Sequence, residues 1–497
     1  MRPLQSPLQA RQLSEYVCNN CTRQLRRQRR RYATTTLTTS SNPDIYDVVC
    51  VGGGPAGLSL LAALRSNPAT SRLKIALVES QSLTPIRSFS LPPTQFSNRC
   101  SSLTPSSVRF LQSIGAWKFV KRERVQAYRE MRVWDGVSGA SIDFDTAALG
   151  PGGKDGVIAY MNENLNLTSA LLQRIDELGG VDVLDGQKVA DIRLGEEGED
   201  VDLSSWPVVK VSGGREITAR LLVGADGANS PVRAFAGIQS RGWDYERHGV
   251  VATLKMEGPG WGGEDHKIAY QRFLPTGPIA MLPLPGSYST LVWSTTPELA
   301  AKLKSLNEQD FVSMVNAGLR LSPTDLKYLH SMPEGQTDEA TWREQHTPFE
   351  TNKIPQRVVG VQEGTIASFP LKFRHADTYI GERIALVGDA AHTVHPLAGQ
   401  GLNQGQGDVE SLAKTIEYSV THGQDIGVQL SLEAYNAERY AQNNLLMGVM
   451  DKLHKLYAVE SGPVVALRSL GLRAVDGLGP LKGFFMKQAA GTGVKVF

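Results

Sequence analysis

Cysteine is scarce in this sequence. Its 497 residues contain only four cysteines, Cys18, Cys21, Cys50 and Cys100. Cys18 and Cys21 form a CxxC pair, but no second pair stands at the spacing that a zinc site needs. Cys50 and Cys100 are too few for a disulfide framework. The sequence therefore predicts neither a zinc module nor a disulfide-stapled fold, and it favours a reducing compartment.

Long apolar runs and a strong net charge are also missing. No stretch of 18 apolar residues occurs, which excludes a helix that spans a membrane. The 52 basic and 50 acidic residues leave a formal net charge of +2, and nothing beyond the N-terminus suggests a nucleic-acid surface. With 41% apolar residues the chain can bury a large core, and its length suggests two or three domains.

The first 32 residues are rich in arginine and poor in acid. They contain eight arginines, no lysine and a single acidic residue, Glu15. This composition is typical of a mitochondrial transit peptide, with cleavage expected after Tyr32 and a Thr/Ser-rich linker over residues 33–43. A basic tail for nucleic acid is the alternative. Loss of the segment removes eight positive charges and one negative charge, and leaves a mildly acidic protein.

A glycine-rich turn follows the first apolar run. Residues 45–51 are rich in β-branched side chains and predict a buried strand, and residues 56–65 predict a helix. A strand, a tight glycine turn and a helix N-terminus are the parts that hold a dinucleotide pyrophosphate. The candidate binding residues of this turn are Gly52, Gly54, Pro55, Ala56 and Gly57. An ordinary loop is the alternative for a glycine pattern taken alone.

An acidic residue stands at the expected distance beyond this turn. Residues 74–78 predict a second strand, and Glu79 ends it 22 residues past Gly57. An acid at about 20 residues can accept the ribose hydroxyls of an adenosine cofactor. The spacing therefore favours nucleotide binding.

Two later segments repeat the pattern of a short apolar strand that runs into a glycine and an aspartate. Residues 221–223 lead to Asp226 and Gly227, and residues 384–387 lead to Gly388 and Asp389. A carboxylate that ends a strand and caps a helix accepts hydroxyl and backbone donors. A plain turn or N-cap aspartate is the alternative for either segment alone.

Together the three motifs resemble the GxGxxG, DG and GD motifs of the single-component FAD-dependent aromatic hydroxylases. The resemblance implies FAD as cofactor, with its pyrophosphate at the glycine turn, the DG segment along cofactor and reductant, and Asp389 bonded to the ribityl chain. It also implies an α/β (α+β) fold. The expected parts are a Rossmann-like FAD-binding domain, an inserted β-sheet substrate domain and a helical C-terminal tail.

The segment after Asp389 predicts a loop followed by a new helix from about residue 402. Proline and glycine rule out a simple helix, and a helix N-terminus pointed at the flavin would stabilise the charge of its reduced form. The candidate residues here are Pro396, Gly399, Gly401, Leu402 and Asn403. His392 and His395 form a weak metal pattern because no further ligand stands nearby, so no metal is predicted.

Further stretches resemble one branch of the family, the mitochondrial ubiquinone-biosynthesis flavin monooxygenases and their bacterial relatives. They are residues 97–102, 131–135, 160–164, 243–254, 271–284 and 369–374. In this branch an arginine in the position of Arg99 reaches the flavin and its phosphates. The similarity spans residues 44 to about 460, except that the polar stretch 318–350 does not align and is expected to be a surface insertion.

The resemblance implies a discontinuous domain order. We expect the FAD-binding domain over residues 44–120, 160–240 and 370–420, the substrate domain over 121–159 and 241–369, and a helical C-terminal region over 421–497. Candidate strands of the substrate domain are residues 250–256, 269–273, 279–284 and 290–294. Residues 435–456 and 480–490 predict helices of the tail.

The chemistry implied by the resemblance is hydroxylation of the ring of a polyprenylated 4-hydroxybenzoate or phenol by O2, through a flavin C4a-hydroperoxide. No protein nucleophile or metal is needed, so no catalytic residue is named. The pocket walls implied are loops around residues 241–248, 273–283 and 369–374. Electrons would come from ferredoxin and its reductase, or from NADPH. A hydroxylase of a soluble aromatic and a flavin-binding scaffold subunit remain as alternatives.

The same resemblance implies a place on the matrix side of the mitochondrial inner membrane, as a peripheral protein within a ubiquinone-biosynthesis complex. Basic and apolar residues are mixed in the tail, which can seat a helix on an anionic membrane or dock a partner. They are Lys452, Leu453, Lys455, Leu456, Leu467, Arg468, Leu470, Arg473, Lys482, Phe484, Phe485 and Lys487. A buried face with solvated charges is the alternative.

Overall fold

The computed structural model describes residues 44–146, 156–197, 202–259, 263, 266–349, 353–393 and 400–477. The chain divides into two units, Met1–Pro43 and Asp44–Phe497, and the first unit lies outside the described residues. The expected transit peptide and linker therefore lie outside them. So do the candidate residues Pro396 and Gly399 and the expected helix over residues 480–490.

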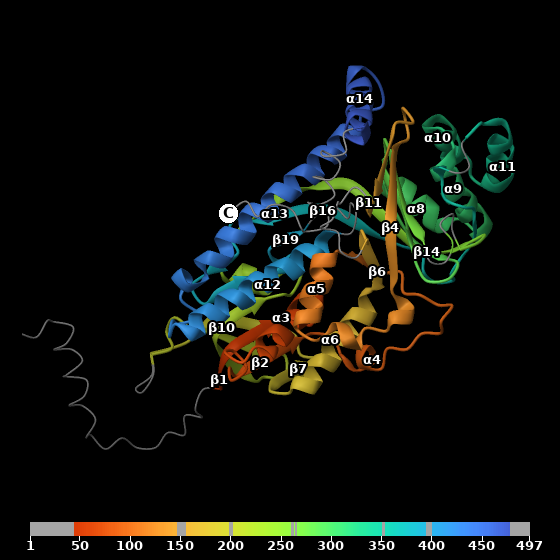
Figure 1. Ribbon diagram of the computed structural model, residues 1–497. Coiled ribbons are helices and arrows are strands. Elements are labelled where there is room, and N and C mark those ends of the chain that lie inside the picture. The colour runs from red at the N-terminus through yellow and green to blue at the C-terminus, as the bar shows by residue number, and fades with distance from the viewer. Residues whose placement is uncertain are drawn as a thin grey trace, which may run out of the picture. The chain divides into compact units, whose positions relative to one another are not determined.

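A mainly parallel sheet is built from strands that lie far apart in the sequence (Figure 1). Its order is β17–β18–β10–β1–β2–β7, with β9 beside β10 and β8 beside β9. The contacts from β18 through to β7 are parallel. The strands are β1 Ile45–Val51, β2 Ile75–Glu79, β7 Val181–Asp185, β8 Val189–Leu194, β9 Pro207–Val211, β10 Glu216–Gly224, β17 Ile380–Gly381 and β18 Ile384–Leu386. The predicted strands over residues 45–51, 74–78, 221–223 and 384–387 are confirmed.

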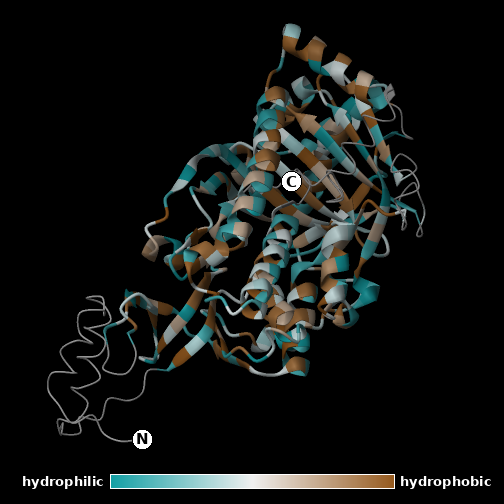
Figure 2. Ribbon diagram, turned by 60° about the vertical axis from the view of Figure 1, so that its left-hand side comes forward, coloured by the Kyte–Doolittle hydropathy of each residue, from teal (hydrophilic) through white to brown (hydrophobic). Residues whose placement is uncertain are grey.

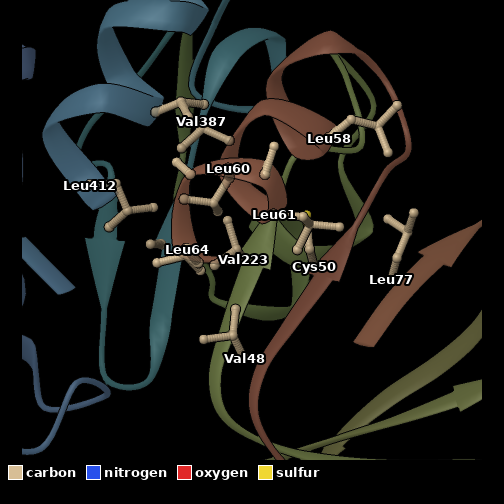
Figure 3. Packing of buried hydrophobic residues seen from close by; sticks show 14 of the residues in the cluster. Val48, Cys50, Leu58, Leu60, Leu61, Leu64, Leu77, Val223, Val387 and Leu412 are labelled. Carbon is tan, nitrogen blue, oxygen red and sulfur yellow. The ribbon is translucent and has the colours of Figure 1, made fainter. Parts of the chain in front are cut away.

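Apolar helices cover this sheet. α3 (Pro55–Ser66) contacts α6 (Asn164–Leu178) and α12 (Gln400–Thr421). Its leucines gather over residues of β1 and β10, with Val387 and Leu412 beside them (Figure 3). All of these side chains are almost fully buried. Packing in this core therefore explains both the β-branched residues of β1 and the apolar residues of α3.

A second, largely antiparallel sheet carries the other half of the fold. Its order is β19–β16–β11–β14–β13–β12–β4–β6–β3, with β15 beside β11 and β5 beside β4. Only the pair β12–β4 is parallel among those described. The strands are β3 Cys100–Leu103, β4 Gln126–Asp135, β5 Ser141–Asp145, β6 Ala159–Glu163, β11 Ser240–Met256, β12 Lys267–Leu274, β13 Gly277–Pro283, β14 Tyr288–Thr295, β15 Val358–Val361, β16 Ala367–Ala376 and β19 His392–Thr393.

The four candidate strands of the inserted sheet are confirmed as parts of β11, β12, β13 and β14. Strands β3, β6, β16 and β19 also pair into this sheet, although they come from the segments expected to form the FAD-binding domain. The described residues from 44 onward belong to one compact unit, so the domain boundaries stay a prediction.

The stretch 318–350 is folded into packed helices, and its being an insertion relative to the family stays a prediction. It contains the end of α9 (Glu308–Arg320), α10 (Pro323–Ser331) and α11 (Gln336–His346). Leu326, Leu329 and Ala340 are buried in one core with Trp293 of β14. Together with α8 (Pro297–Ser305), these helices form a layer packed on the second sheet (Figure 1). The polar composition of this stretch reflects the narrow buried faces of α10 and α11.

The C-terminal region is helical, as predicted. Its described part contains α13 (Gln429–Tyr457) and α14 (Pro463–Gly477), and α14 packs against β5. No helix among the described residues is long and apolar enough to cross a membrane. The remaining helical elements are α4 Thr84–Arg87, α5 Pro105–Ser113, η3 Trp117–Phe119, η4 Arg122–Arg124, α7 Pro231–Phe235 and η7 Gly388–Ala390.

Candidate functional site

Three parallel strands end side by side at one edge of the first sheet. Val51 of β1 pairs with Gly224 of β10, and Gly224 pairs with Leu386 of β18. The glycine turn, the Asp226–Gly227 segment and the Gly388–Asp389 segment each begin within two residues of these positions. The sheet therefore brings the three sequence motifs together, at the edge where open α/β sheets bind ligands.

The glycine turn is shaped by close backbone approach. Gly52 has φ +110°, and a side-chain carbon there would lie 2.3 Å from the Ala225 carbonyl oxygen. A side-chain carbon on Gly57 would lie 2.0 Å from the Gly52 carbonyl oxygen. At Gly54, by contrast, nothing lies within 4 Å. Gly52 and Gly57 are therefore needed for packing, while Gly54 borders open space.

The N-terminus of α3 has no side-chain cap. Gly54 occupies the N-cap position with extended backbone, and Pro55 stands in the first turn. The first backbone amides of a helix need a partner from outside it, and a phosphate can supply one. Pro55, Ala56 and Gly57 thus lie where the fingerprint predicts, at a helix end that is open to an anion.

Glu79 lies next to this turn, at the end of β2. Its Oε2 atom accepts a hydrogen bond from the Gly53 amide at 2.6 Å, and Oε1 accepts one from the Gln81 amide at 2.8 Å. The carboxylate is therefore held at the rim of the turn, and it remains partly accessible.

Asp226 has one oxygen in use and one without a partner. Oδ2 accepts a hydrogen bond from the Val232 amide at 3.2 Å, at the start of α7. Oδ1 is buried and has no hydrogen-bond partner in the structure described. Burial raises the pKa of this carboxyl, and hydrogen bonds from Ser230 and Val232 oppose the rise. The free acceptor is suited to a donor that the chain itself does not provide.

Arg233 joins two of the motifs. Its guanidinium donates to the Ala390 carbonyl at 2.7 Å and to the Ala228 carbonyl at 2.6 Å. The side chain thus ties the segment after Asp226 to the segment after Asp389. Its place in the first turn after the DG motif was visible in the sequence, but this bridging role was not.

The Gly388–Asp389 turn packs against the start of α3. Gly388 has φ +60°, and a side-chain carbon there would lie 3.4 Å from the Ala56 side chain. The Asp389 side chain is exposed, and it makes no hydrogen bond with the described part of the chain. Asp389 is accordingly available to a ligand.

Behind this turn lies a buried group that sequence reasoning missed. Asp408 of α12 is fully buried, and its carboxylate contacts His392, Arg439 and the Gly388 amide. His392 is therefore a structural residue paired with a carboxylate. Among the described residues, no group of three or more His, Cys, Asp or Glu side chains is placed to hold a metal ion.

Gly401, Leu402 and Asn403 lie in the first turn of α12, which begins at Gln400, two residues earlier than expected. The side chain of Asn403 is used within the protein. Its Oδ1 atom accepts hydrogen bonds from the Thr104 amide at 2.9 Å and from the Ser107 hydroxyl at 2.8 Å. Its Nδ2 atom donates to the Ser102 carbonyl at 2.7 Å. A role of Asn403 toward a cofactor would therefore have to come through its backbone.

Arg99 is exposed in the loop before β3, and its side chain makes no hydrogen bond with the described residues. The loop itself is fixed. The Ser97 amide donates to Glu163 at 2.6 Å, and Glu163 forms a buried ion pair with Arg124, also at 2.6 Å. Asn98 donates to the Thr365 carbonyl at 2.7 Å. The backbone of Arg99 is thus held firmly while its guanidinium remains free.

The three segments expected to be loops around a pocket are strands, which corrects that expectation. Residues 241–248 lie in β11, residues 273–283 in β12 and β13, and residues 369–374 in β16. A cavity of about 370 Å³ opens between the first and third of them and α13. It is lined by Arg241, Trp243, Phe373, His375, Tyr440 and Asn444, among others. Segment 273–283 does not contribute to it.

The residues at the strand ends fit a flavin adenine dinucleotide. The uncapped start of α3 can take the pyrophosphate, and Glu79 stands where a ribose would be bound. The unpartnered oxygen of Asp226 and the free carboxylate of Asp389 can accept further donors of the cofactor. Together they supply acceptors and backbone amides along one edge of the sheet, the combination that a dinucleotide needs.

Comparison with known proteins agrees with this geometry. The model of the family "FAD binding domain" matches residues 45–447. The chain is 41% identical to "Ubiquinone biosynthesis monooxygenase COQ6, mitochondrial" of Schizosaccharomyces pombe, over 90% of this chain and 92% of that protein. It is also 41% identical to the protein of the same name from Saccharomyces cerevisiae, over 91% and 95%. The crystal structure of p-nitrophenol 4-monooxygenase from Pseudomonas putida superposes with a TM-score of 0.64 and 17% identity, covering 91% of this chain and 100% of that one.

Proposed function

Because this chain belongs to the FAD binding domain family and, within it, to the ubiquinone biosynthesis monooxygenases, we propose that it hydroxylates the ring of a polyprenylated 4-hydroxybenzoate or phenol intermediate of ubiquinone biosynthesis. Its cofactor is FAD. The observation that carries the proposal is the register of Val51, Gly224 and Leu386, which gathers the three cofactor motifs at one sheet edge.

In this proposal the chain holds the cofactor through residues of all three motifs. The amides at the start of α3 receive the pyrophosphate, Glu79 receives the ribose hydroxyls, and Asp389 receives the ribityl chain. Arg99, by resemblance to the family, would bind the phosphates and the flavin. Gly227, Gly401 and Leu402 would present their backbone to the isoalloxazine, and the same role is proposed for Pro396 and Gly399, which lie outside the described residues. The segments 44–120, 160–240 and 370–420 remain the proposed FAD-binding part, opposite a substrate part built on the second sheet.

When bound, FAD would supply the redox chemistry: with two electrons from a reductant and two protons, one oxygen atom of O2 enters the ring as a hydroxyl group and the other leaves as water. The chain's own task is to bind the ring beside the flavin, to hold it in orientation and to exclude water. No side chain is assigned as a nucleophile or metal ligand in this scheme.

We further propose that ferredoxin and its reductase deliver the electrons, with NADPH as the competing source. The two relatives from yeasts are named as mitochondrial proteins. The arginine-rich composition of residues 1–32 supports import of this chain into mitochondria. We also propose a peripheral place on the matrix side of the inner membrane, within a ubiquinone-biosynthesis complex, and the lipid character of the proposed substrate supports membrane association. Exposed leucines on α14 support this placement.

Product analysis by mass spectrometry tests the function. The mature protein, residues 33–497 with FAD bound, is supplied with a short-chain prenyl-4-hydroxybenzoate and either ferredoxin with its reductase or NADPH. We expect the ring to gain one oxygen atom with ferredoxin. Asp389→Ala should abolish this gain, whereas Asp191→Ala, at an exposed position of β8, should not. An unmodified ring in the presence of reduced flavin, with either reductant, would rule out the proposed substrate.

A further inference from the structure

The carboxylate of Asp408 sits at the centre of a buried polar cluster that reaches the Gly388–Asp389 turn. Oδ2 accepts a hydrogen bond from the Gly388 amide at 3.1 Å and lies 2.5 Å from His392 Nε2. Oδ1 accepts hydrogen bonds from Arg439 Nε and from Asn443 Nδ2, each at 2.9 Å. Both oxygens are therefore fully used, by groups from two separate segments of the chain, residues 388–392 and helix α13.

This carboxylate is charged and fixed in orientation. The Asp408 and His392 side chains are completely buried, and the Arg439 side chain is nearly so. Burial alone would raise the pKa of Asp408, but His392 and Arg439 outweigh it and hold the pKa well below its usual range. A buried charge with complete hydrogen bonding has a single favourable position, because any displacement leaves a donor or acceptor unpaired.

Two backbone amides anchor the turn that follows β18, one to the sheet and one to a side chain. The Val387 amide donates to the Gly224 carbonyl at 2.9 Å, which continues the sheet. The next amide, that of Gly388, no longer follows the sheet and donates to Asp408 instead. Gly388 has φ +60°, so this is the point where the chain leaves the strand direction. The position of Asp389, one residue on, therefore depends on the Asp408 acceptor.

Helix α13 holds Asp408 from behind. Arg439 also donates to Asn443 Oδ1 at 2.9 Å and to the Gln404 carbonyl at 3.4 Å, so it links α13 to the first turns of α12. Asn443 donates in addition to the Tyr379 hydroxyl at 3.3 Å. Helix α13, which lies outside the three sequence motifs, is thus connected to the Gly388–Asp389 turn through the side chain of Asp408.

We propose that Asp408 is a positioning residue for FAD: it holds the Gly388–Asp389 turn in its cofactor-binding shape, and Arg439 and Asn443 of α13 hold Asp408 in place. The inference rests on FAD as the family cofactor, and it makes no use of the substrate or electron donor. It extends the flavin site to the C-terminal region of the chain.

Binding of FAD to the apoprotein of Asp408→Asn tests the proposal. The asparagine keeps the shape of the side chain, but it removes the charge and turns one acceptor into a donor facing a donor. We expect the Kd for FAD, from titration of flavin fluorescence, to rise at least 10-fold. At saturating FAD, the visible circular dichroism of the bound flavin should differ from that of the wild type, because the ribityl contact is displaced. A loss of general stability alone would leave that spectrum unchanged.

Asp425 provides a matched control. It also pairs with two arginines and a glycine amide, since it accepts hydrogen bonds from Arg220 at 2.8 Å, Arg383 at 3.0 Å and the Gly427 amide at 3.0 Å. No contact of Asp425 with residues 388–389 is among those described. We expect Asp425→Asn to lower the melting temperature of the apoprotein while its Kd for FAD stays within twofold of the wild-type value.

A milder variant covers the case in which Asp408→Asn does not fold. Arg439→Lys keeps a positive charge beside Asp408 but cannot reproduce the fork of hydrogen bonds. We expect it to weaken FAD binding at least threefold, with the same change in the flavin spectrum. The proposal is overturned if the folded variants at positions 408 and 439 bind FAD within twofold of the wild type and show its spectrum. Because no phenol is present, a wrong substrate assignment would leave these results untouched.

Discussion

At Gly57 the start of α3 crosses the glycine turn with no room for a side chain. A side-chain carbon would lie 2.0 Å from the Gly52 carbonyl oxygen and 3.2 Å from Cys50 Sγ, in the middle of the first sheet. Neither the backbone of Gly52 nor the buried strand β1 can move without a large cost in folding free energy. We expect Gly57→Ala to destabilise the protein by about 3 kcal/mol and to weaken FAD binding more than 10-fold. Urea unfolding and flavin titration measure the two effects.

Gly54 is the internal control for this prediction. It lies in the same turn, has an ordinary extended backbone, and has nothing within 4 Å of a side-chain carbon. Gly54→Ala should therefore cost about 1 kcal/mol or less in unfolding free energy, since only the N-cap preference changes. Equal effects of the two substitutions on stability would mean that the close approach at Gly57 has been misjudged.

His330 of α10 makes folding stability depend on pH. The ring lies 6.0 Å from Trp293, and its Nδ1 atom is buried without a partner in the structure described. Burial, with Lys302 adding to it, lowers the pKa of His330 to about 4. The unfolded chain binds the proton more readily, with a pKa of about 6.5. The stability from neutral His330 is thus fully present above about pH 6.5 and is lost as the pH falls toward 4.

The size of this effect can be measured by comparing unfolding free energies at pH 7 and pH 5. Between these values wild-type protein should lose about 2 kcal/mol through His330. His330→Gln should lose correspondingly less, because its side chain does not titrate. His422→Gln, at an exposed position of the chain, should follow the wild type. A variant at position 330 with the full wild-type pH dependence would contradict the assignment.

At the scale of elements, the sequence predicts the strands and turns at the cofactor edge of the first sheet. It does not predict the buried side chains, such as Asp408, that hold those turns in place. β1, α3 and β2 are each encoded by a short run of apolar residues in the local sequence. The hydrophobic pattern therefore locates their ends within one or two residues. Asp408 is different, because its partners His392 and Arg439 are 16 and 31 residues away. Nothing in the local pattern of a polar helix marks a residue whose role depends on such distant contacts.

The same reasoning explains what was wrong at the second sheet. Residues 318–350 contain the end of α9 together with α10 and α11, and the buried positions of α10 and α11 are few, so the polar composition did not indicate packed helices. The three expected pocket loops are strands because β11, β12, β13 and β16 extend beyond their most apolar segments. Each of these strands continues to pair with its neighbours beyond the end of its own apolar segment. The sequence of one strand does not show which strand lies beside it, so its full length is not predicted.

The attachment of α14 depends on one buried ion pair. The Nε atom and one terminal nitrogen of Arg468 donate hydrogen bonds to the two carboxylate oxygens of Asp135 in β4, at 2.9 and 3.1 Å. Both side chains are completely buried. Arg468 also donates to the carbonyls of Leu456 and Val459. Removing one partner leaves a buried charge unpaired, so Arg468→Met should cost about 3–5 kcal/mol. Arg468 is therefore not part of a basic outer face of the tail, which corrects that expectation.

Arg473, on the exposed side of the same helix, is the control for this prediction. Arg473→Met should change the unfolding free energy by about 0.5 kcal/mol or less. Hydrogen exchange should show faster exchange of α14 in the Arg468 variant only. If α14 exchanges equally slowly in both variants, apolar packing rather than the ion pair holds the helix.

At the scale of the whole molecule, apolar side chains remain exposed on the last described helix. Leu467 and Leu470 are 67% and 65% exposed and lie three residues apart, so they share one face of α14. Apolar segments also run along this helix in Figure 2. On α13, the Lys455 side chain is 64% exposed and Leu456 is exposed next to it. A soluble protein rarely leaves neighbouring leucines uncovered without an interaction that uses them.

If the proposed substrate with its polyprenyl chain is correct, we expect a bilayer to be the partner of this surface, on which Arg473 is also exposed. Each leucine transferred from water to lipid contributes about 2 kcal/mol, so Leu467→Ser with Leu470→Ser should weaken binding to vesicles at least 10-fold. Flotation with phosphatidylcholine vesicles, with and without cardiolipin, measures this. Tyr418→Ser, which removes an exposed ring from α12, should leave binding unchanged. Equal flotation of the wild type and the double variant would mean that the leucines of α14 meet a protein rather than a membrane.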